Sequence, residues 1–181
     1  MHDFRASVAI SDHIADAEWW ESLYRAAFGP RYRHSRKVTF EAEPLFQRQG
    51  LDRMVYLDGG GGTEKLVLVE EKVRRQLWTD VLLEIWSDKA RKHPGWAKKP
   101  LHCDYIVYAF PTAKRAYLIP FLLMQNALRE NYHEWLRLAQ GGIEGFGLVE
   151  AQNKGYVTQS LAVPLDALLA AMASVSMVSW P

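Results

Sequence analysis

The alternation of apolar and polar residues predicts a β-hairpin near the middle of the chain. Residues 51–57 and 65–74 each have the composition of a strand, and residues 66–69 of the second form an uninterrupted apolar run. Such a run favours a strand that is buried on both faces. Asp58 and four consecutive glycines separate the two strands. Glycines supply the positive φ angles that a tight reversal needs, so a hairpin is the simplest interpretation.

Periodic patterns elsewhere predict an α/β fold around this hairpin. Helices are expected at residues 12–28, at residues 120–140 and from Pro164 onward, because apolar residues recur every three or four positions or a Gly-Pro pair ends the pattern. The uncharged run at 167–180 is interpreted as a docked C-terminal helix. Further strands are expected at 37–42, 78–87, 105–110, 115–119, 145–151 and 155–163. We therefore expect a single domain over residues 1–181, with a mixed β-sheet flanked by helices.

Composition places the chain among globular proteins. It has 181 residues, of which 49% are hydrophobic, which is enough to bury the core of one domain. Cys103 is the single cysteine, which excludes an internal disulfide and fits a reducing compartment. The first residues lack the basic and apolar regions of a secretory signal, and no stretch is apolar for long enough to cross a bilayer. These features predict a cytoplasmic protein with no membrane partner.

The distribution of charge is more informative than its sum. The chain carries 22 basic and 21 acidic residues, for a net charge of +1, which does not by itself indicate a nucleic-acid-binding protein. Basic residues gather in three places: at residues 31–37, at residues 74–75 just after the predicted hairpin, and in the loop at residues 88–100. The alternative interpretation of the last segment is a solvated loop. Candidate contacts to nucleic-acid phosphates are Arg74, Arg75, Lys89, Arg91, Lys92, Lys98 and Lys99.

A small group of charged residues lies where the hairpin strands end. Side chains alternate along a strand, so Glu70 and Lys72 share one face and Glu71 takes the other. Antiparallel pairing across the glycine turn brings Asp52 near the same end. Two carboxylates suit a hard cation such as Mg²⁺ or Mn²⁺, and an adjacent ammonium can orient a water or offset developing charge. The alternative interpretation is a solvated strand end.

Three further residues are candidates for accessory roles. Glu21 belongs to the predicted first helix, where the default interpretation is an exposed ion pair with Arg25. Gln49 lies just before the first hairpin strand and could hold a water or a phosphate, or cap a turn. Glu84 lies between apolar neighbours in a predicted strand and needs a partner if it is buried. Lys72 or an arginine on the adjoining strand is the expected partner.

The order of these residues resembles the core motif of the PD-(D/E)xK nuclease superfamily, in which an aspartate on one strand precedes Glu-x-Lys on the next. More narrowly, the chain is similar to small phage- and prophage-type proteins of that superfamily. The similarity runs through QRQGLDRMVYL and VEEKVRR and continues in DVLLEIWSD and PGWAKKPLHCDYIVYAF. Leu51 stands where the motif has proline. The resemblance implies a restriction-endonuclease-like core in which Asp52, Glu70 and the Glu71 carbonyl bind the metal and Lys72 is the catalytic lysine.

The resemblance implies a Mg²⁺-dependent nuclease, endo- or exonucleolytic, that hydrolyses phosphodiester bonds in DNA. A second hypothesis is a non-catalytic nucleic-acid-binding or assembly protein on the same scaffold, and a third is a protein-interaction module that uses exposed aromatic residues. The sequence leaves open whether the substrate is DNA or RNA and whether the protein acts as a homodimer. Zinc-ligand spacing, a phosphate-cradling Walker A motif and a nucleophile elbow are all absent from the sequence.

Overall fold

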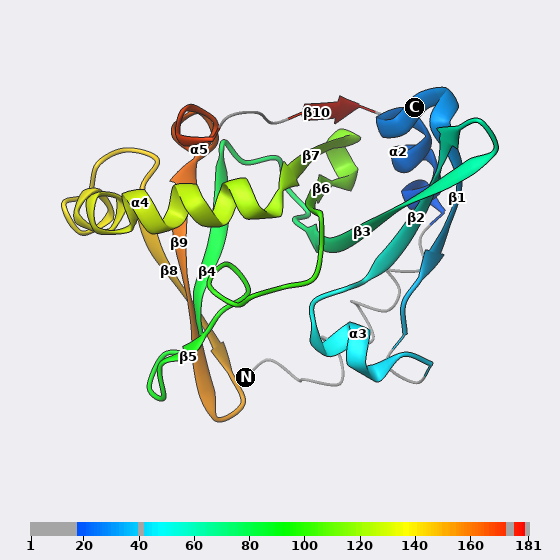
Figure 1. The fold of residues 1–181 in the computed structure, drawn as a ribbon. Coiled ribbons are helices and arrows are strands. Elements are labelled where there is room, and N and C mark those ends of the chain that lie inside the picture. Colours follow the sequence, from blue (N-terminus) through cyan, green and yellow to red (C-terminus); the bar gives the residue numbers. More distant parts are fainter. Residues whose placement is uncertain (1–17, 40–41, 173–175, 180–181) are drawn as a thin grey trace. The chain divides into compact units, whose positions relative to one another are not determined.

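Figure 1 shows the fold in a computed structural model, which describes residues 18–39, 42–172 and 176–179. The protein is mixed α/β, with a mixed sheet flanked by helices, as the sequence predicts. It divides into two compact units, each with its own sheet. Within the described residues, the six-strand unit contains 18–77, 101–121 and 176–179, and the four-strand unit contains 78–100 and 122–172. That the chain acts as a single domain stays a prediction.

The six-strand sheet has the strand order β1-β2-β3-β6-β7-β10. β3 and β6 are parallel and all other neighbours are antiparallel, which makes the sheet mixed. The strands are β1 (Tyr32–Lys37), β2 (Arg53–Gly60), β3 (Thr63–Val73), β6 (Tyr105–Phe110), β7 (Arg115–Pro120) and β10 (Ser176–Ser179). The helical segments are α2 (Trp19–Phe28), η1 (Gly29–Arg31), α3 (Pro44–Arg48) and η2 (Pro111–Ala113).

The central hairpin forms where the sequence predicts it. β2 and β3 pair antiparallel, with Arg53 opposite Val69 at the end away from the turn. Gly60, Gly61 and Gly62 have φ angles of 85°, 60° and 81°. A side chain at such angles is strained, so the glycine run is what allows so short a reversal.

The two faces of this sheet carry different residues. On the face that we call the helix face, Trp20, Leu23 and Tyr24 of α2 form a buried cluster with Val55 and Val67. On the other face, which we call the reverse face, a separate cluster contains Val38, Leu51, Met54, Tyr56 and Leu68. Because strand side chains alternate, odd-numbered residues of β3 point to the helix face and even-numbered residues to the reverse face.

The four-strand sheet has the order β5-β4-β9-β8 and is antiparallel throughout. Its strands are β4 (Asp80–Asp88), β5 (His93–Pro94), β8 (Gly147–Asn153) and β9 (Tyr156–Pro164), and its helices are α4 (Phe121–Gln140) and α5 (Leu165–Ala171). The alternate residues Val81, Leu83 and Ile85 of β4 are buried, as the pattern predicts. Among the described residues, no helix combines the length and apolar character that a membrane span requires.

Two expected elements near the start of the chain are wrong. The first strand is β1 at residues 32–37, so the basic stretch is itself a strand. Of the strand expected at 37–42, residues 38, 39 and 42 are not in a strand, and residues 40 and 41 lie outside the described residues. β1 pairs with β2 along its length, and this tertiary pairing outweighs the local apolar signal farther on. The segment expected as a loop before β2 contains the short helix α3. The start of the predicted first helix, residues 12–17, lies outside the described residues.

The C-terminal segment also differs from expectation. α5 ends at Ala171, and residues 176–179 form strand β10 where a continuous helix was expected. β10 pairs antiparallel with the outer edge of β7. Because the pairing joins segments far apart in sequence, a local pattern of uncharged residues could not reveal it.

Gly95 offers a test of the packing in the four-strand unit. A Cβ atom there would lie 2.3 Å from the carbonyl oxygen of Glu84, a main-chain atom that cannot move aside cheaply. We expect Gly95→Ala to lower the free energy of unfolding by about 2 kcal/mol or more in urea denaturation. Gly147→Ala, in the same unit, meets only Ala162 at 3.9 Å and should change it by less than about 0.5 kcal/mol. Equal values for the two variants would contradict the predicted packing.

Candidate metal centre

Asp52 and Glu70 lie together on the reverse face of the six-strand sheet. The pairing of β2 with β3 ends at Arg53 and Val69, and the Asp52 amide donates a hydrogen bond of 2.9 Å to the Val69 carbonyl, which places Asp52 beside Glu70. Alternation along each strand directs the Asp52 and Glu70 side chains to the reverse face. The two carboxyl groups lie close enough for the charge of Asp52 to affect the ionisation of Glu70. Glu70 is only 7% exposed, whereas Asp52 is half-buried.

Lys72 joins this pair from the same face of β3. Its ammonium donates a hydrogen bond to Glu70 Oε1 within an ion pair, and its side chain is 27% exposed, against 9% for Glu70. Burial raises the pKa of Glu70. Attraction to Lys72 opposes this rise, whereas repulsion from Asp52 reinforces it. A cation between the carboxyl groups would relieve that repulsion.

The main chain of Glu71 lies next to the Asp52 carboxylate. Its amide donates a hydrogen bond of 2.8 Å to Asp52 Oδ2. The N–H and C=O of one residue in a strand point to the same side, so the Glu71 carbonyl is directed toward the edge at which Asp52 lies. The Glu71 side chain is 5% exposed although the residue as a whole is only half-buried, so the exposed part is its main chain. Carboxylate and carbonyl oxygens are the ligands that hard divalent cations prefer.

The Glu71 side chain lies on the helix face, in contact with Arg53 and Tyr24. Arg53 Nε donates to Glu71 Oε1 at 2.6 Å, and the Tyr24 hydroxyl donates to the same oxygen at 2.8 Å. Burial raises the pKa of Glu71 to about 7, although Arg53 pulls it down. Burial lowers the pKa of Arg53, but attraction to Glu71 outweighs this and raises it. Arg53 therefore stays charged while the carboxyl group titrates near neutral pH.

Arg53 and Tyr24 were not among the expected site residues. A signal for Arg53 was present in the sequence, because alternation along β2 places it on the same face as Val55 and Leu57, both buried. An arginine among buried residues requires an anion. Glu71 is the acid on the matching face of β3. No pattern in the sequence indicated the Tyr24 hydroxyl, because its position depends on how α2 packs on the sheet.

Two of the accessory candidates, Glu21 and Glu84, belong to other elements than the hairpin that carries Asp52 and Glu70. Glu21 on α2 accepts hydrogen bonds from Arg25, at 3.0 Å, and from the Tyr32 hydroxyl. The expected ion pair with Arg25 is confirmed, and the packing of α2 on the helix face keeps Glu21 from the reverse face. Glu84 lies on β4, in the four-strand sheet, so the expectation that Lys72 is on a neighbouring strand is wrong.

Glu84 and Gln49 each accept a hydrogen bond from a main-chain amide within their own unit. Glu84 Oε1 accepts a hydrogen bond of 3.3 Å from the Trp96 amide, which helps to hold the loop after β5. The Gln49 carbonyl accepts a hydrogen bond of 3.1 Å from the His102 amide. That contact ties the segment before β2 to the segment before β6. A role of the Gln49 side chain near Asp52 stays a prediction.

The candidate phosphate contacts fall in both units. Arg74 and Arg75 follow the Glu-x-Lys sequence at the end of β3, where the Arg74 amide donates to the Ala109 carbonyl at 2.9 Å. The other five, Lys89, Arg91, Lys92, Lys98 and Lys99, belong to the four-strand unit. Lys89 is paired with Glu150 at 2.5 Å and Arg91 with Asp88 at 2.7 Å, and these ion pairs reduce the local positive charge.

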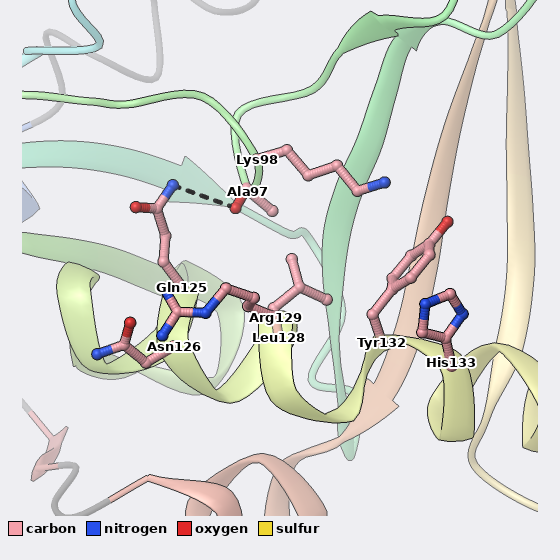
Figure 2. Close-up of a pocket in the computed structure, with 8 residues that line it drawn as sticks. All are labelled: Ala97, Lys98, Gln125, Asn126, Leu128, Arg129, Tyr132 and His133. Atoms are coloured by element: carbon pink, nitrogen blue, oxygen red, sulfur yellow. Dashed lines mark hydrogen bonds between the residues drawn. The ribbon is translucent and has the colours of Figure 1, made fainter.

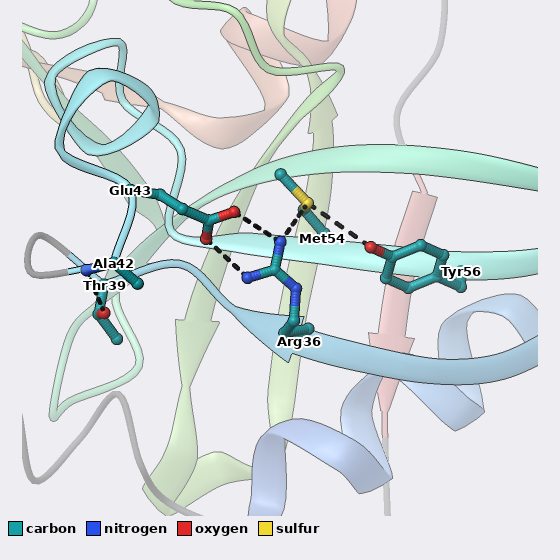
Figure 3. Close-up of polar contacts among 6 residues, drawn as sticks. All are labelled: Arg36, Thr39, Ala42, Glu43, Met54 and Tyr56. Atoms are coloured by element: carbon teal, nitrogen blue, oxygen red, sulfur yellow. Dashed lines mark hydrogen bonds and ion pairs between the residues drawn. The ribbon is translucent and has the colours of Figure 1, made fainter.

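The basic stretch of β1 is likewise occupied by internal contacts. Figure 3 shows Arg36 between Glu43 and Met54: its guanidinium forms bonds of 2.6 and 2.8 Å to the two Glu43 oxygens and one of 3.1 Å to Met54 Sδ. Arg33 is paired with Asp58 at 2.5 Å. Both contacts stabilise β1 against the hairpin and the segment before it.

Comparisons of the chain with protein-family models, curated proteins and solved structures gave no match. The resemblance to the PD-(D/E)xK superfamily and the restriction-endonuclease-like core therefore stay predictions from the sequence. In the part of the chain that the structure describes, no group of three or more His, Cys, Asp or Glu side chains has the arrangement of a metal site. The candidate centre accordingly rests on two carboxylates and one main-chain carbonyl.

The buried Glu71 predicts a pH dependence of stability in metal-free buffer. Its folded-state pKa is about 7 against an ordinary 4.5, so its contribution to stability is complete below about pH 4.5 and is lost as the pH rises through 7. The glutamine in Glu71→Gln has no titratable group. Between pH 5 and pH 8 we therefore expect the free energy of unfolding of the parent to fall by about 1–3 kcal/mol more than that of the variant. Chemical denaturation in EDTA at both pH values measures this difference.

Glu64→Gln provides the matched control, because Glu64 lies on the same strand and is exposed. It should keep the pH dependence of the parent protein. The pKa of about 7 already includes the attraction to Arg53, so the comparison of the parent with Glu71→Gln measures the net effect of ionisation at residue 71. A pH dependence in Glu71→Gln equal to that of Glu64→Gln would refute the assignment.

Proposed function

We propose that the protein is a divalent-metal-dependent nuclease that hydrolyses phosphodiester bonds, with Asp52, Glu70 and Lys72 at its centre. The observation that carries the proposal is the meeting of two carboxyl groups and one ammonium on a single face at the end of the hairpin. Asp52, Glu70 and the Glu71 carbonyl would hold Mg²⁺ or Mn²⁺, because these are hard oxygen ligands. When bound, the metal supplies Lewis-acid activation of the phosphodiester.

Each residue has a defined task in this proposal. Glu70, adjacent to Asp52, accepts a hydrogen bond from Lys72 and so fixes the ammonium at the edge of the site. The ammonium orients a water toward phosphorus and offsets the negative charge that develops there. The water oxygen forms a bond to phosphorus while one ester P–O bond breaks. The products are a phosphate monoester and a sugar hydroxyl, which takes a proton from the water.

The substrate in this proposal is a nucleic acid, with DNA as the first choice from the resemblance. Arg74 and Arg75 directly follow the site on the chain, where they could contact the phosphate backbone. The non-catalytic alternative remains a second hypothesis, because several basic residues form internal ion pairs. Binding of DNA in Ca²⁺ without turnover in Mg²⁺ or Mn²⁺ would favour that alternative.

The decisive variant for the proposed function is Lys72→Ala. Loss of a donor that stabilises transition-state charge typically costs about 10²- to 10³-fold in rate, so we expect a loss of this size in Mg²⁺- or Mn²⁺-dependent cleavage. The melting temperature should change little, because the Lys72 side chain is 27% exposed and water can replace its ammonium beside Glu70. The assay follows plasmid DNA, single-stranded DNA and RNA, with EDTA as the blank.

Lys65→Ala is the control for charge and strand. Lys65 lies on β3 and is exposed, and replacing it with alanine changes the net charge by the same amount as Lys72→Ala does. It should cleave at the parent rate. Cleavage by Lys72→Ala at the same rate as by Lys65→Ala would reject the proposed role, and absence of metal-dependent cleavage in the parent on all three substrates would reject the function.

A further inference from the structure

A pocket of about 440 Å³ lies in the four-strand unit, between α4 and the loop after β5. Two apolar residues line it from opposite sides, Ala97 on the loop and Leu128 on α4 (Figure 2), and they are 1% and 3% exposed. The other side chains that line the pocket carry polar groups. Its volume is within the range of small-ligand sites in proteins. None of its residues takes part in the proposed hydrolysis.

Lys98 and Arg129 bring two cations to this pocket. In the part of the chain that the structure describes, neither has a carboxylate partner, which contrasts with the ion-paired Lys89, Arg91 and Arg137. The Lys98 ammonium lies 4.2 Å from the ring centroid of Trp86 and 4.1 Å from that of Tyr132. The two ring faces hold the ammonium in place without neutralising it, so it can still attract an anion.

The two cations lie at different ends of the pocket. Figure 2 shows Arg129 with Asn126 at one end, and Lys98 with Tyr132 and His133 at the other. Asn126, Arg129 and Tyr132 are three residues apart on α4 and therefore share one face of the helix. The Arg129 guanidinium lies beside Asn126 and the Lys98 ammonium beside Tyr132, and from Asn126 to Tyr132 this stripe of the helix rises roughly 9 Å, at about 1.5 Å per residue. A single phosphate cannot contact both ends, whereas an extended chain of phosphates can.

Aromatic rings and an amide complete the chemistry of the stripe. The rings of Tyr132 and His133 lie 5.5 Å apart, centroid to centroid. Aromatic faces beside cations are the usual means of binding unpaired bases and their backbone together. The Asn126 side chain is exposed and offers both a donor and an acceptor. An acidic peptide would use the cations but would leave the ring faces without stacking partners.

We infer that this pocket binds single-stranded nucleic acid, with backbone phosphates at Arg129 and Lys98 and a base stacked on the exposed ring of His133. The choice of nucleic acid rests on the proposed function. The binding itself does not depend on cleavage or on the candidate metal centre. Such a site favours single strands, because a paired base cannot leave its stack to reach the rings without an energetic cost.

The test measures binding of a fluorescent oligo-dT and of a blunt duplex of equal length by anisotropy in EDTA, where metal-dependent cleavage is excluded. We expect Arg129→Ala to weaken oligo-dT binding roughly 3- to 10-fold and to reduce the salt dependence by about 0.7 in log–log slope, the value for one lost contact to a single strand. Arg129→Glu should weaken it further. The parent should bind the single strand more tightly than the duplex.

Arg137→Ala is the matched control, because Arg137 lies on the same helix, carries the same charge and is paired with Glu134 at 2.6 Å outside the pocket. It should bind oligo-dT as the parent does. Equal binding by Arg129→Ala and Arg137→Ala, or no preference for the single strand, overturns the inference. The readout here is binding and not cleavage. If the parent protein binds the single strand as expected but never cleaves nucleic acid, the proposed nuclease function is rejected and the inferred binding site is not.

Discussion

The antiparallel register of β2 and β3 is the constraint on which both sides of the candidate centre depend. With Arg53 opposite Val69, Asp52 meets Glu70 on the reverse face, while Arg53 meets Glu71 on the helix face. A slip of one residue would send every side chain of one strand to the opposite face. The glycine turn and the buried Arg53–Glu71 pair both favour the observed register.

The acidic side chains on the two faces of the sheet have different partners. On the helix face, Glu71 receives a guanidinium and a hydroxyl from the protein itself, in a space closed by α2. On the reverse face, Asp52 and Glu70 stand against each other, and their mutual repulsion contributes to the raised pKa of Glu70. The first arrangement is typical of a structural ion pair. The second is typical of sites that bind a cation or move a proton, which is why we assign the proposed chemistry to the reverse face.

Much of this arrangement could be predicted from the sequence. Alternation along the strands and the glycine run were sufficient to predict the hairpin and to place Asp52, Glu70 and Lys72 at one end. Elements that depend on distant pairing could not be predicted in this way. Glu84 was expected beside Lys72 because its strand follows in sequence, yet β4 belongs to another sheet. The stripe at Asn126 and Arg129 was missed because the helix pattern was interpreted only through its apolar face.

Calorimetric titration with Mn²⁺ tests the central claim most directly, namely that Asp52 and Glu70 form one divalent-cation site. The parent protein and Glu71→Gln, which keeps the Glu71 carbonyl, should both bind one Mn²⁺ per chain. Glu70→Gln and Asp52→Asn, each folded by circular dichroism, should lose at least about 10-fold in affinity, because each removes a charged oxygen ligand. Equal Mn²⁺ affinity in all four proteins, or no binding by the parent, would contradict the account.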